Sequence, residues 1–263
     1  MRYGIFTGFS KLKRQHLKMM REIGISDAYI CLIAKRNFSG MRSVEDTIVS
    51  LRTVVDEGLV PHLMYWVFRD SAYIAAMVNH VVQSTKLIYP ASILLNCEKD
   101  YETGKYDPIQ AAAQIRLGLS NYKLGVVRIF DPTPSPAMAA VINVCEYDMP
   151  EAYSIWFPQQ EPHWSHDKAT FPGTMQQNIA EHRVPNKRLV MGLACYFGDR
   201  PATTAHPKMS KELTISMSLN ETHRQGVHEA VYWSMPHLTR GDKTANETLM
   251  CLKSEFQRYK MPV

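Results

Sequence analysis

Short hydrophobic runs alternate along the chain with longer segments whose apolar residues recur at helical spacing. The short runs are rich in β-branched and aromatic residues, which favour strands. They predict strands at 3–8, 27–34, 61–68, 92–98, 125–130, 152–157, 188–196 and 229–233. The longer segments predict helices at 11–23, 43–57, 71–84, 108–119, 135–144, 174–182, 210–225 and 244–259. Such strict alternation implies parallel strands joined by crossover helices.

Local signals mark both ends of the helix expected at 43–57. Ser43 supplies a hydroxyl at the N-cap, and the acid Asp46 follows three residues later, as in a capping box. Gly58 comes directly after the last periodic residue, where glycine commonly ends a helix. This segment is therefore predicted to start and stop at residues that its own sequence specifies.

Eight strand–helix units in 263 residues match a (β/α)8 barrel, which takes about 250 residues. The main alternative is a doubly wound open sheet, which usually carries a glycine-rich phosphate-binding turn after its first strand. Here that turn reads Thr7-Gly8-Phe9-Ser10 and lacks this fingerprint. No Pro-, Gly- or Ser-rich linker divides the chain. We therefore predict an α/β fold, a single (β/α)8 TIM barrel that forms one domain over residues 1–263.

Composition narrows the classes of partner and compartment. The formal net charge is +5, but the Lys and Arg residues are scattered, so we expect a solvated surface rather than a nucleic-acid interface. Five cysteines without paired spacing argue against a disulfide framework. The first strand starts without the apolar segment of a signal peptide, and no stretch is long enough to span a bilayer. We expect synthesis in a reducing cytoplasm and no membrane partner, which is compatible with later release by lysis or packaging into a particle.

The candidate chemistry lies where TIM barrels keep theirs, at the C-terminal ends of the strands. The fourth predicted strand ends in Leu94-Leu95-Asn96-Cys97-Glu98. Because side chains alternate along a strand, Asn96 and Glu98 share a face with Leu94, opposite Leu95 and Cys97. We expect the apolar pair Leu95 and Cys97 to pack under the helices, which points Asn96 and Glu98 into the barrel mouth.

Aromatic side chains are predicted to crowd the same rim. Aromatic rings stack on the apolar faces of sugars, while carboxylates and amides bind sugar hydroxyls, so this composition favours a carbohydrate site. The candidate substrate-binding residues are Tyr65, Trp66, Tyr153, Trp156, Trp164, Tyr196, Asp199, Tyr232 and Trp233. The loop at 158–171, which carries Trp164, is expected to overhang the mouth and contribute to specificity.

The Asn96-Cys97-Glu98 tripeptide at the end of the fourth strand resembles the Asn-x-Glu of endo-β-N-acetylglucosaminidase-type barrels. It is also similar to the end of the Asp-x-Glu motif of chitinase-like and lysozyme-like barrels, with Asn96 in place of the first acid. The resemblance covers the architecture and this tripeptide. It implies a glycoside hydrolase in which Glu98 protonates the leaving oxygen and Asn96 holds the substrate's acetamido group, whose own oxygen attacks. Tyr153 or Tyr196 would complete that grip.

Other readings stay open on the sequence alone. In a two-carboxylate mechanism, Asp131, Asp199 or Asp70 would pair with Glu98, at a separation that sets the stereochemistry. Glu98 could instead form a structural ion pair with Arg128 or Lys99. The remaining alternatives are a non-catalytic sugar-binding or structural barrel in a larger assembly and a divalent-metal isomerase or hydrolase.

The ten histidines show no metal-ligand spacing, so neither a metal nor a cofactor is expected. The metal-dependent alternative would need side chains converging from several strand ends. The residues available for that are Glu98, Asp131, His163 and Asp199.

Overall fold

The computed structural model describes residues 1–8, 12–32, 42–129, 134–151, 187–195 and 211–259. Its strands are β1 (Arg2–Phe6), β2 (Asp27–Leu32), β3 (Val60–Trp66), β4 (Ile93–Cys97), β5 (Leu124–Ile129), β6 (Tyr147–Glu151), β7 (Arg188–Leu189), β8 (Met191–Ala194) and β9 (Glu229–Trp233). The described helices are α1 (Arg14–Ile23), α2 (Val44–Asp56), α3 (Ser71–Ser84), α4 (Lys99–Glu102), α5 (Pro108–Gly118), α6 (Pro136–Val144), α8 (Lys211–Arg224), α9 (Met235–Leu238) and α10 (Lys243–Arg258).

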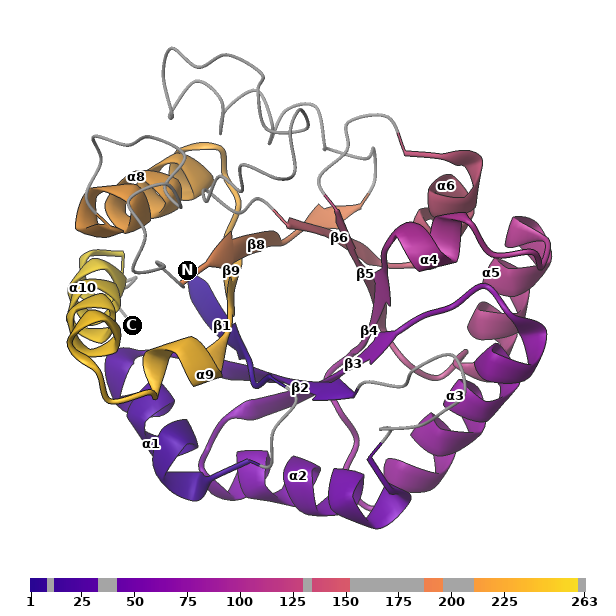
Figure 1. The fold of residues 1–263 in the computed structure, drawn as a ribbon, viewed down its shortest axis with the longest axis horizontal. Helices are drawn as coiled ribbons and strands as arrows, with labels where there is room; N and C mark the ends of the chain where they lie inside the picture. Colours follow the sequence, from indigo (N-terminus) through magenta and orange to yellow (C-terminus); the bar gives the residue numbers. More distant parts are fainter. Residues whose placement is uncertain (9–11, 33–41, 130–133, 152–186, 196–210, 260–263) are drawn as a thin grey trace.

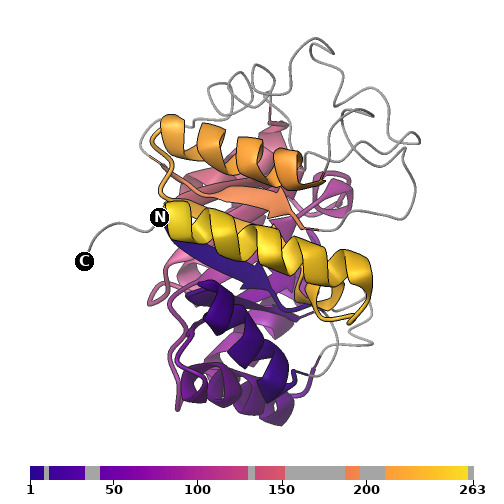
Figure 2. The same cartoon turned by 90° about the vertical axis from the view of Figure 1, so that its left-hand side faces the viewer.

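The strands form a closed parallel barrel surrounded by helices (Figure 1). Pairing runs in parallel from β1 through β2, β3, β4, β5 and β6, and returns through β8 and β9 to β1. The short strands β7 and β8 both pair with β6 and make two segments of one barrel strand. Figure 2 shows α8 and α10 side by side outside the wall. The predicted (β/α)8 barrel is therefore confirmed.

Side chains in the turns set the helix starts. The Ser43 hydroxyl accepts a hydrogen bond from the Asp46 amide at 3.0 Å, which confirms the predicted cap of α2. Gly58, just beyond that helix, has a φ of +73°, a conformation that favours glycine. Asp70, Asp107, Ser135 and Asp242 cap α3, α5, α6 and α10 in the same way. These caps fix where each helix leaves the rim on which the strands end.

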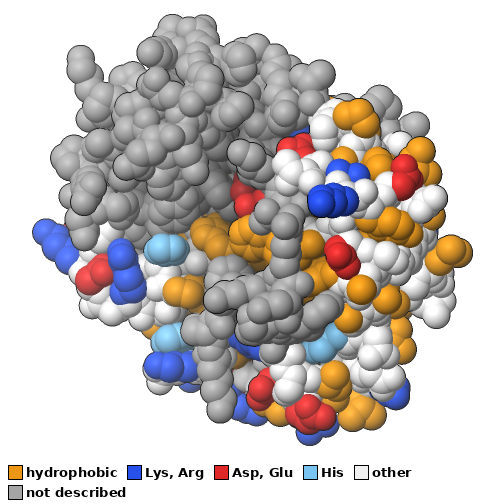
Figure 3. All heavy atoms as spheres, turned by 45° about the vertical axis from the view of Figure 1, so that its right-hand side comes forward, with side chains coloured by type: hydrophobic (Ala, Val, Ile, Leu, Met, Phe, Trp, Pro, Cys, Tyr) orange, Lys and Arg blue, Asp and Glu red, His pale blue; other side chains and the backbone are white. Residues whose placement is uncertain are grey.

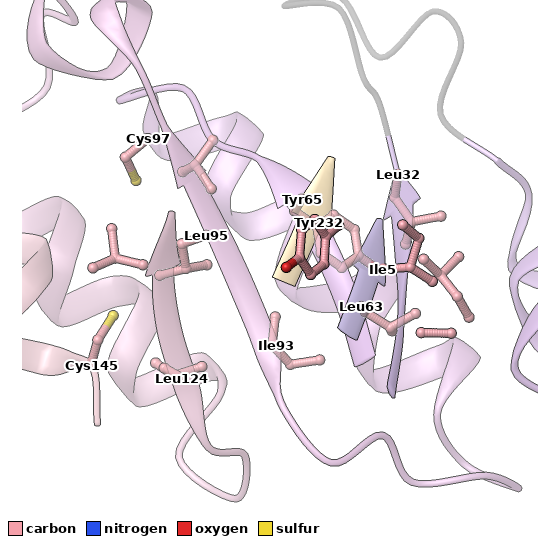
Figure 4. Packing of buried hydrophobic residues seen from close by; sticks show 14 of the residues in the cluster. Ile5, Leu32, Leu63, Tyr65, Ile93, Leu95, Cys97, Leu124, Cys145 and Tyr232 are labelled. Carbon is pink, nitrogen blue, oxygen red and sulfur yellow. The ribbon is translucent and has the colours of Figure 1, made fainter. Parts of the chain in front are cut away.

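Two separate apolar cores follow from the alternation of side chains along each strand. Leu94 lies inside the barrel with residues such as Tyr29, Met64 and Val231. Leu95 and Cys97 lie in the layer between the barrel and the helices. Figure 4 shows them there with Leu124 and Cys145. The predicted faces of β4 are thus confirmed, and Asn96 and Glu98 share the parity of interior Leu94.

The predicted position of the sixth strand is wrong. We expected it at 152–157, which lie outside the described residues, whereas β6 is the preceding segment Tyr147-Asp148-Met149-Pro150-Glu151. The two acids and the proline of this segment are more typical of a turn than of a strand. Tertiary contacts override that reading, because Asp148 is paired in a buried ion pair and Met149 fills the barrel interior.

The surface carries both signs of charge. On the face drawn in Figure 3, the described Lys and Arg side chains are interspersed with Asp and Glu. Within the described ranges, no helix is long and apolar enough to cross a membrane. The helix expected at 174–182 falls outside the part of the chain that the structure describes.

Candidate functional site at the barrel mouth

Asn96 and Glu98 lie together at the C-terminal end of β4. The Asn96 Nδ2 group donates to the Glu98 Oε1 atom at 3.2 Å. Asn96 is only 2% exposed, whereas Glu98 is half-buried. The Asn96 Oδ1 atom is buried and has no hydrogen-bond partner among the described residues. A buried acceptor without a partner is costly, so this end of β4 holds a polar pair that is arranged for something other than packing.

Two tryptophans end strands on the same rim as this pair. Trp66 ends β3 in register with Asn96 and is half-buried; it has the parity of interior Met64, but it packs against the core between barrel and helices. Its buried Nε1 group also lacks a hydrogen-bond partner within the described residues. Trp233 ends β9 and packs on the interior core, its ring 5.2 Å from that of Phe6. Trp66, Asn96, Glu98 and Trp233 thus lie at strand ends on one rim, where TIM barrels carry their active sites.

The structure places Tyr65 and Tyr232 away from the mouth. Both belong to the layer between barrel and helices, and each is at most 1% exposed. The Tyr65 hydroxyl lies 2.7 Å from His80 Nδ1 on α3, while the Tyr232 ring packs 5.7 Å from Phe256 of α10. Burial raises the pKa of both phenols. These side chains lie among groups that hold helices to the barrel wall.

Two residues from the alternative readings have structural partners. The Asp70 carboxylate accepts from the Tyr73 amide at 2.9 Å and caps α3. Arg128 donates to both oxygens of Asp148, with N–O distances of 2.9 and 2.7 Å. Val126 in the helix-facing core and Val127 in the interior core place Arg128 on the helix-facing side of β5. The Lys99 side chain is outside the described set.

Several predicted site residues fall outside the described ranges. They are Asp131, Tyr153, Trp156, His163, Trp164, Tyr196 and Asp199, together with the loop at 158–171. Of the four residues considered for a metal, Glu98 alone is described. No group of three or more His, Cys, Asp or Glu side chains within the described residues could hold a metal ion.

The opposite, N-terminal end of the barrel holds a polar network that sequence reasoning missed. His62 lies 2.9 Å from Asp27 Oδ1 and 2.7 Å from Ser92 Oγ, and Ser92 continues to the Tyr147 hydroxyl at 2.6 Å. Arg2 also pairs with Asp27. The order Asp–His–Ser resembles a nucleophilic triad, but all three residues are at most 6% exposed and Ser92 is bonded on both sides. We assign this network to closing the barrel floor.

The pKa of Asp27 shows how this network is balanced. Burial by itself raises the pKa of the carboxyl. Hydrogen bonds from His62 and Ser26, together with the charges of His62 and Arg2, outweigh burial and leave the pKa below its ordinary value. The carboxylate is therefore the stable form of Asp27 in the folded protein.

A second feature that the sequence did not reveal is a cavity of about 280 Å³ on the rim outside the mouth. Arg69, Tyr73, Lys105 and Tyr106 are among its lining residues, and neither Asn96 nor Glu98 is. Arg69 forms part of its wall while donating its own hydrogen bonds to backbone carbonyls of the segment that follows Glu98.

These observations define the class: a (β/α)8 barrel that carries a polar pair, Asn96 and Glu98, and two tryptophans, Trp66 and Trp233, at the ends of strands on its C-terminal rim. No protein-family model and no curated protein matches the sequence. Solved structures do share its fold. The Bacillus cereus spore cortex-lytic enzyme SleL superposes with a TM-score of 0.62 at 10% identity, covering 95% of this chain and 74% of that one.

Two further structures fit over nearly their whole length. A class V chitinase from Pseudomonas fluorescens Pf-5 has a TM-score of 0.62 at 15% identity, covering 97% of this chain and 99% of the chitinase. The catalytic domain of the major endoglucanase from Xanthomonas campestris pv. campestris has a TM-score of 0.64 at 11% identity, with coverages of 97% and 94%. At such identities the likeness establishes the barrel fold, and function must be argued from the site.

Proposed function

We propose that this protein is a glycoside hydrolase that cleaves an N-acetylhexosaminide glycan, of the peptidoglycan or chitin type, with Glu98 as general acid. The observation that carries the proposal is the Asn96–Glu98 hydrogen bond of 3.2 Å at the end of β4. Support also comes from the fold, which this chain shares with a spore cortex-lytic enzyme and chitinases. The Asn-x-Glu resemblance points to the same chemistry.

The proposed reaction assigns each atom of the pair a task. The Glu98 carboxyl gives its proton to the glycosidic oxygen as the bond from that oxygen to the anomeric carbon breaks. The substrate's acetamido oxygen supplies the electron pair that forms the new bond to that carbon. Water then adds to the anomeric carbon, the acetamido oxygen leaves, and the Glu98 carboxylate takes up the water proton.

Asn96 would orient the acetamido group during this attack. Its Nδ2 group is already directed at Glu98, and its Oδ1 atom is the acceptor without a partner in the described structure. An acetamido N–H is a donor of the matching kind. Trp66 and Trp233 would supply aromatic surface beside the sugar.

The test is turnover on chromogenic and polymeric glycans by wild type and Glu98→Gln. We expect a loss of at least roughly two orders of magnitude with the fold intact, because Gln cannot donate a carboxylic proton. Glu45→Gln is the matched control: Glu45 is an exposed acid in the first turn of α2, outside the mouth.

Three results would count against the proposal. Equal turnover by wild type and Glu98→Gln would remove Glu98 from the mechanism. Glycan binding without turnover by either protein would make the barrel a binding module. Equal cleavage of N-acetylated and de-N-acetylated glycans would refute the role of the acetamido oxygen and leave a second carboxylate as the nucleophile or base.

A further inference from the structure

Arg69 lies three residues beyond the end of β3. In the hydrogen bonds that the structure describes, its guanidinium donates only to backbone carbonyls of one neighbouring segment. The Nε group donates to the Tyr101 carbonyl at 2.9 Å, Nη2 to the Glu102 carbonyl at 2.7 Å, and Nη1 to the Tyr106 carbonyl at 2.5 Å. A planar fork of donors can reach three carbonyls at once, which a single ammonium group cannot do with the same geometry. Arg69 is thus a clamp on residues 101–106.

The backbone from Glu98 leads directly into the clamped segment. The amides of Tyr101 and Glu102 donate to the Glu98 carbonyl at 2.8 and 3.3 Å, so the short helix α4 starts from the proposed general acid. A helix of four residues does not hold its own shape, because its terminal carbonyls lack partners within it. Arg69 supplies donors to the carbonyls of Tyr101 and Glu102, the last two residues of α4.

Other contacts leave little room for this segment to move. A Cβ at Gly104 would meet Arg69 Cβ at 2.4 Å and the Arg69 carbonyl oxygen at 2.8 Å, so the backbone runs tightly against Arg69. On the other side, the Ser135 hydroxyl at the start of α6 donates to the Glu102 carboxylate at 2.8 Å. Beneath it, the Tyr101 side chain is completely buried. The segment is therefore fixed by Arg69 after β3, by Ser135 at the start of α6, and by the burial of its own Tyr101 side chain.

We propose that Arg69 is a positioning residue for Glu98: it fixes the backbone after β4 and thereby the direction from which the Glu98 carboxyl meets the glycosidic oxygen. This inference rests on the proposed function and extends it to a residue that does not touch substrate. Catalysis needs the proton donor within hydrogen-bond reach of the leaving oxygen, and a shift of about 1 Å can cost two orders of magnitude in rate.

The experiment compares wild type with Arg69→Met, Arg69→Lys and Gly104→Ala. We expect Arg69→Met to lower kcat by roughly 10–100-fold with little change in KM, because the acid is displaced while the tryptophans stay in place. Arg69→Lys should recover only part of the loss. Gly104→Ala attacks the same contact from the other side and should lower kcat in the same direction.

Two further readouts separate positioning from general loss of structure. A displaced acid should lower kcat while KM, which reports substrate binding, changes little, whereas general loss of structure should impair both. Hydrogen–deuterium exchange of amides 99–106 should accelerate in Arg69→Met. Arg21→Met is the control, since Arg21 donates to the Glu57 carbonyl at 2.9 Å at the opposite end of the barrel.

The results separate the structural role of Arg69 from its effect on catalysis. Unchanged exchange of amides 99–106 in Arg69→Met would show that Arg69 does not hold the segment. Faster exchange with unchanged kcat, or an equal loss in kcat and gain in KM, would overturn the positioning role. If wild type and the Glu98→Gln variant show no difference in turnover, the proposed function fails and the catalytic role of Arg69 falls with it, while the exchange data still report whether the clamp exists.

Discussion

The ion pair between Arg128 and Asp148 is the sharpest test of how the barrel wall is held closed. It joins β5 to β6 on the helix-facing side through two hydrogen bonds of 2.9 and 2.7 Å. The side chains of Arg128 and Asp148 are only 2% and 1% exposed. The charges are therefore shielded from solvent and depend on each other.

The expected magnitude follows from that burial. Arg128→Met leaves the Asp148 carboxylate buried without its main partner, which should cost about 3–5 kcal/mol of unfolding free energy. At about 2–4 °C per kcal/mol for a protein of this size, the melting temperature should fall by roughly 6–20 °C. Asp148→Leu should also lower the unfolding free energy, because it removes the carboxylate that pairs with both donors of the buried guanidinium.

The assay is urea unfolding of both single variants and the double variant, arranged as a double-mutant cycle. Replacing both charges by apolar side chains removes the stranded group, so the double variant should lose less than either single variant. The control is the Arg116–Glu146 pair, at 3.1 Å but 38% and 43% exposed, where Arg116→Met should cost about 0–1 kcal/mol. The reasoning is refuted if Arg128→Met costs no more than Arg116→Met, or if the two single losses simply add.

Two further predictions concern Tyr65 and Asp27. Tyr65→Phe should leave glycan turnover unchanged but lower the unfolding free energy by about 1–3 kcal/mol, because His80 Nδ1 loses its partner in a buried site; impaired turnover at full stability would return Tyr65 to the substrate site. The folded pKa of Asp27 is lowered, so its contribution to stability is present above the ordinary Asp pKa and is lost as pH falls through the folded value. Unfolding free energy measured against pH should therefore decline less steeply in acid for Asp27→Asn than for wild type, and parallel curves would contradict this account.

The fold could be predicted from the sequence because the information is local and repeated. Strand-like runs and helical periodicity alternate through the whole chain, and short-range rules of connection then permit few topologies. The caps of helices such as α2 are equally local, since Ser43 bonds an amide three residues away. Of the candidate site, the side-by-side placement of Asn96 and Glu98 followed from the two-residue period of one strand.

Tertiary structure decided which aromatic side chains of β3 and β9 point under the helices. In a closed barrel both faces are buried, so hydrophobicity cannot tell the mouth side from the helix side. Tyr65 and Trp66 are adjacent aromatics at the end of β3, yet Tyr65 lies under α3 and Trp66 has interior parity. The same holds for Tyr232 and Trp233 in β9.

Long-range pairing also decided features that no local pattern marks. The segment of β6 contains acids and a proline, and two contacts with β5 allow it to form a strand. Arg128 pairs with Asp148, and Gly125 leaves room for the Tyr147 ring, whose Cζ would lie 2.2 Å from a Cβ at that position. No local sequence pattern distinguishes Arg69 from other residues that follow a strand. Only the packing of the segment after Glu98 against the end of β3 gives its guanidinium three carbonyls to bind, since such a contact depends on where two loops meet in space.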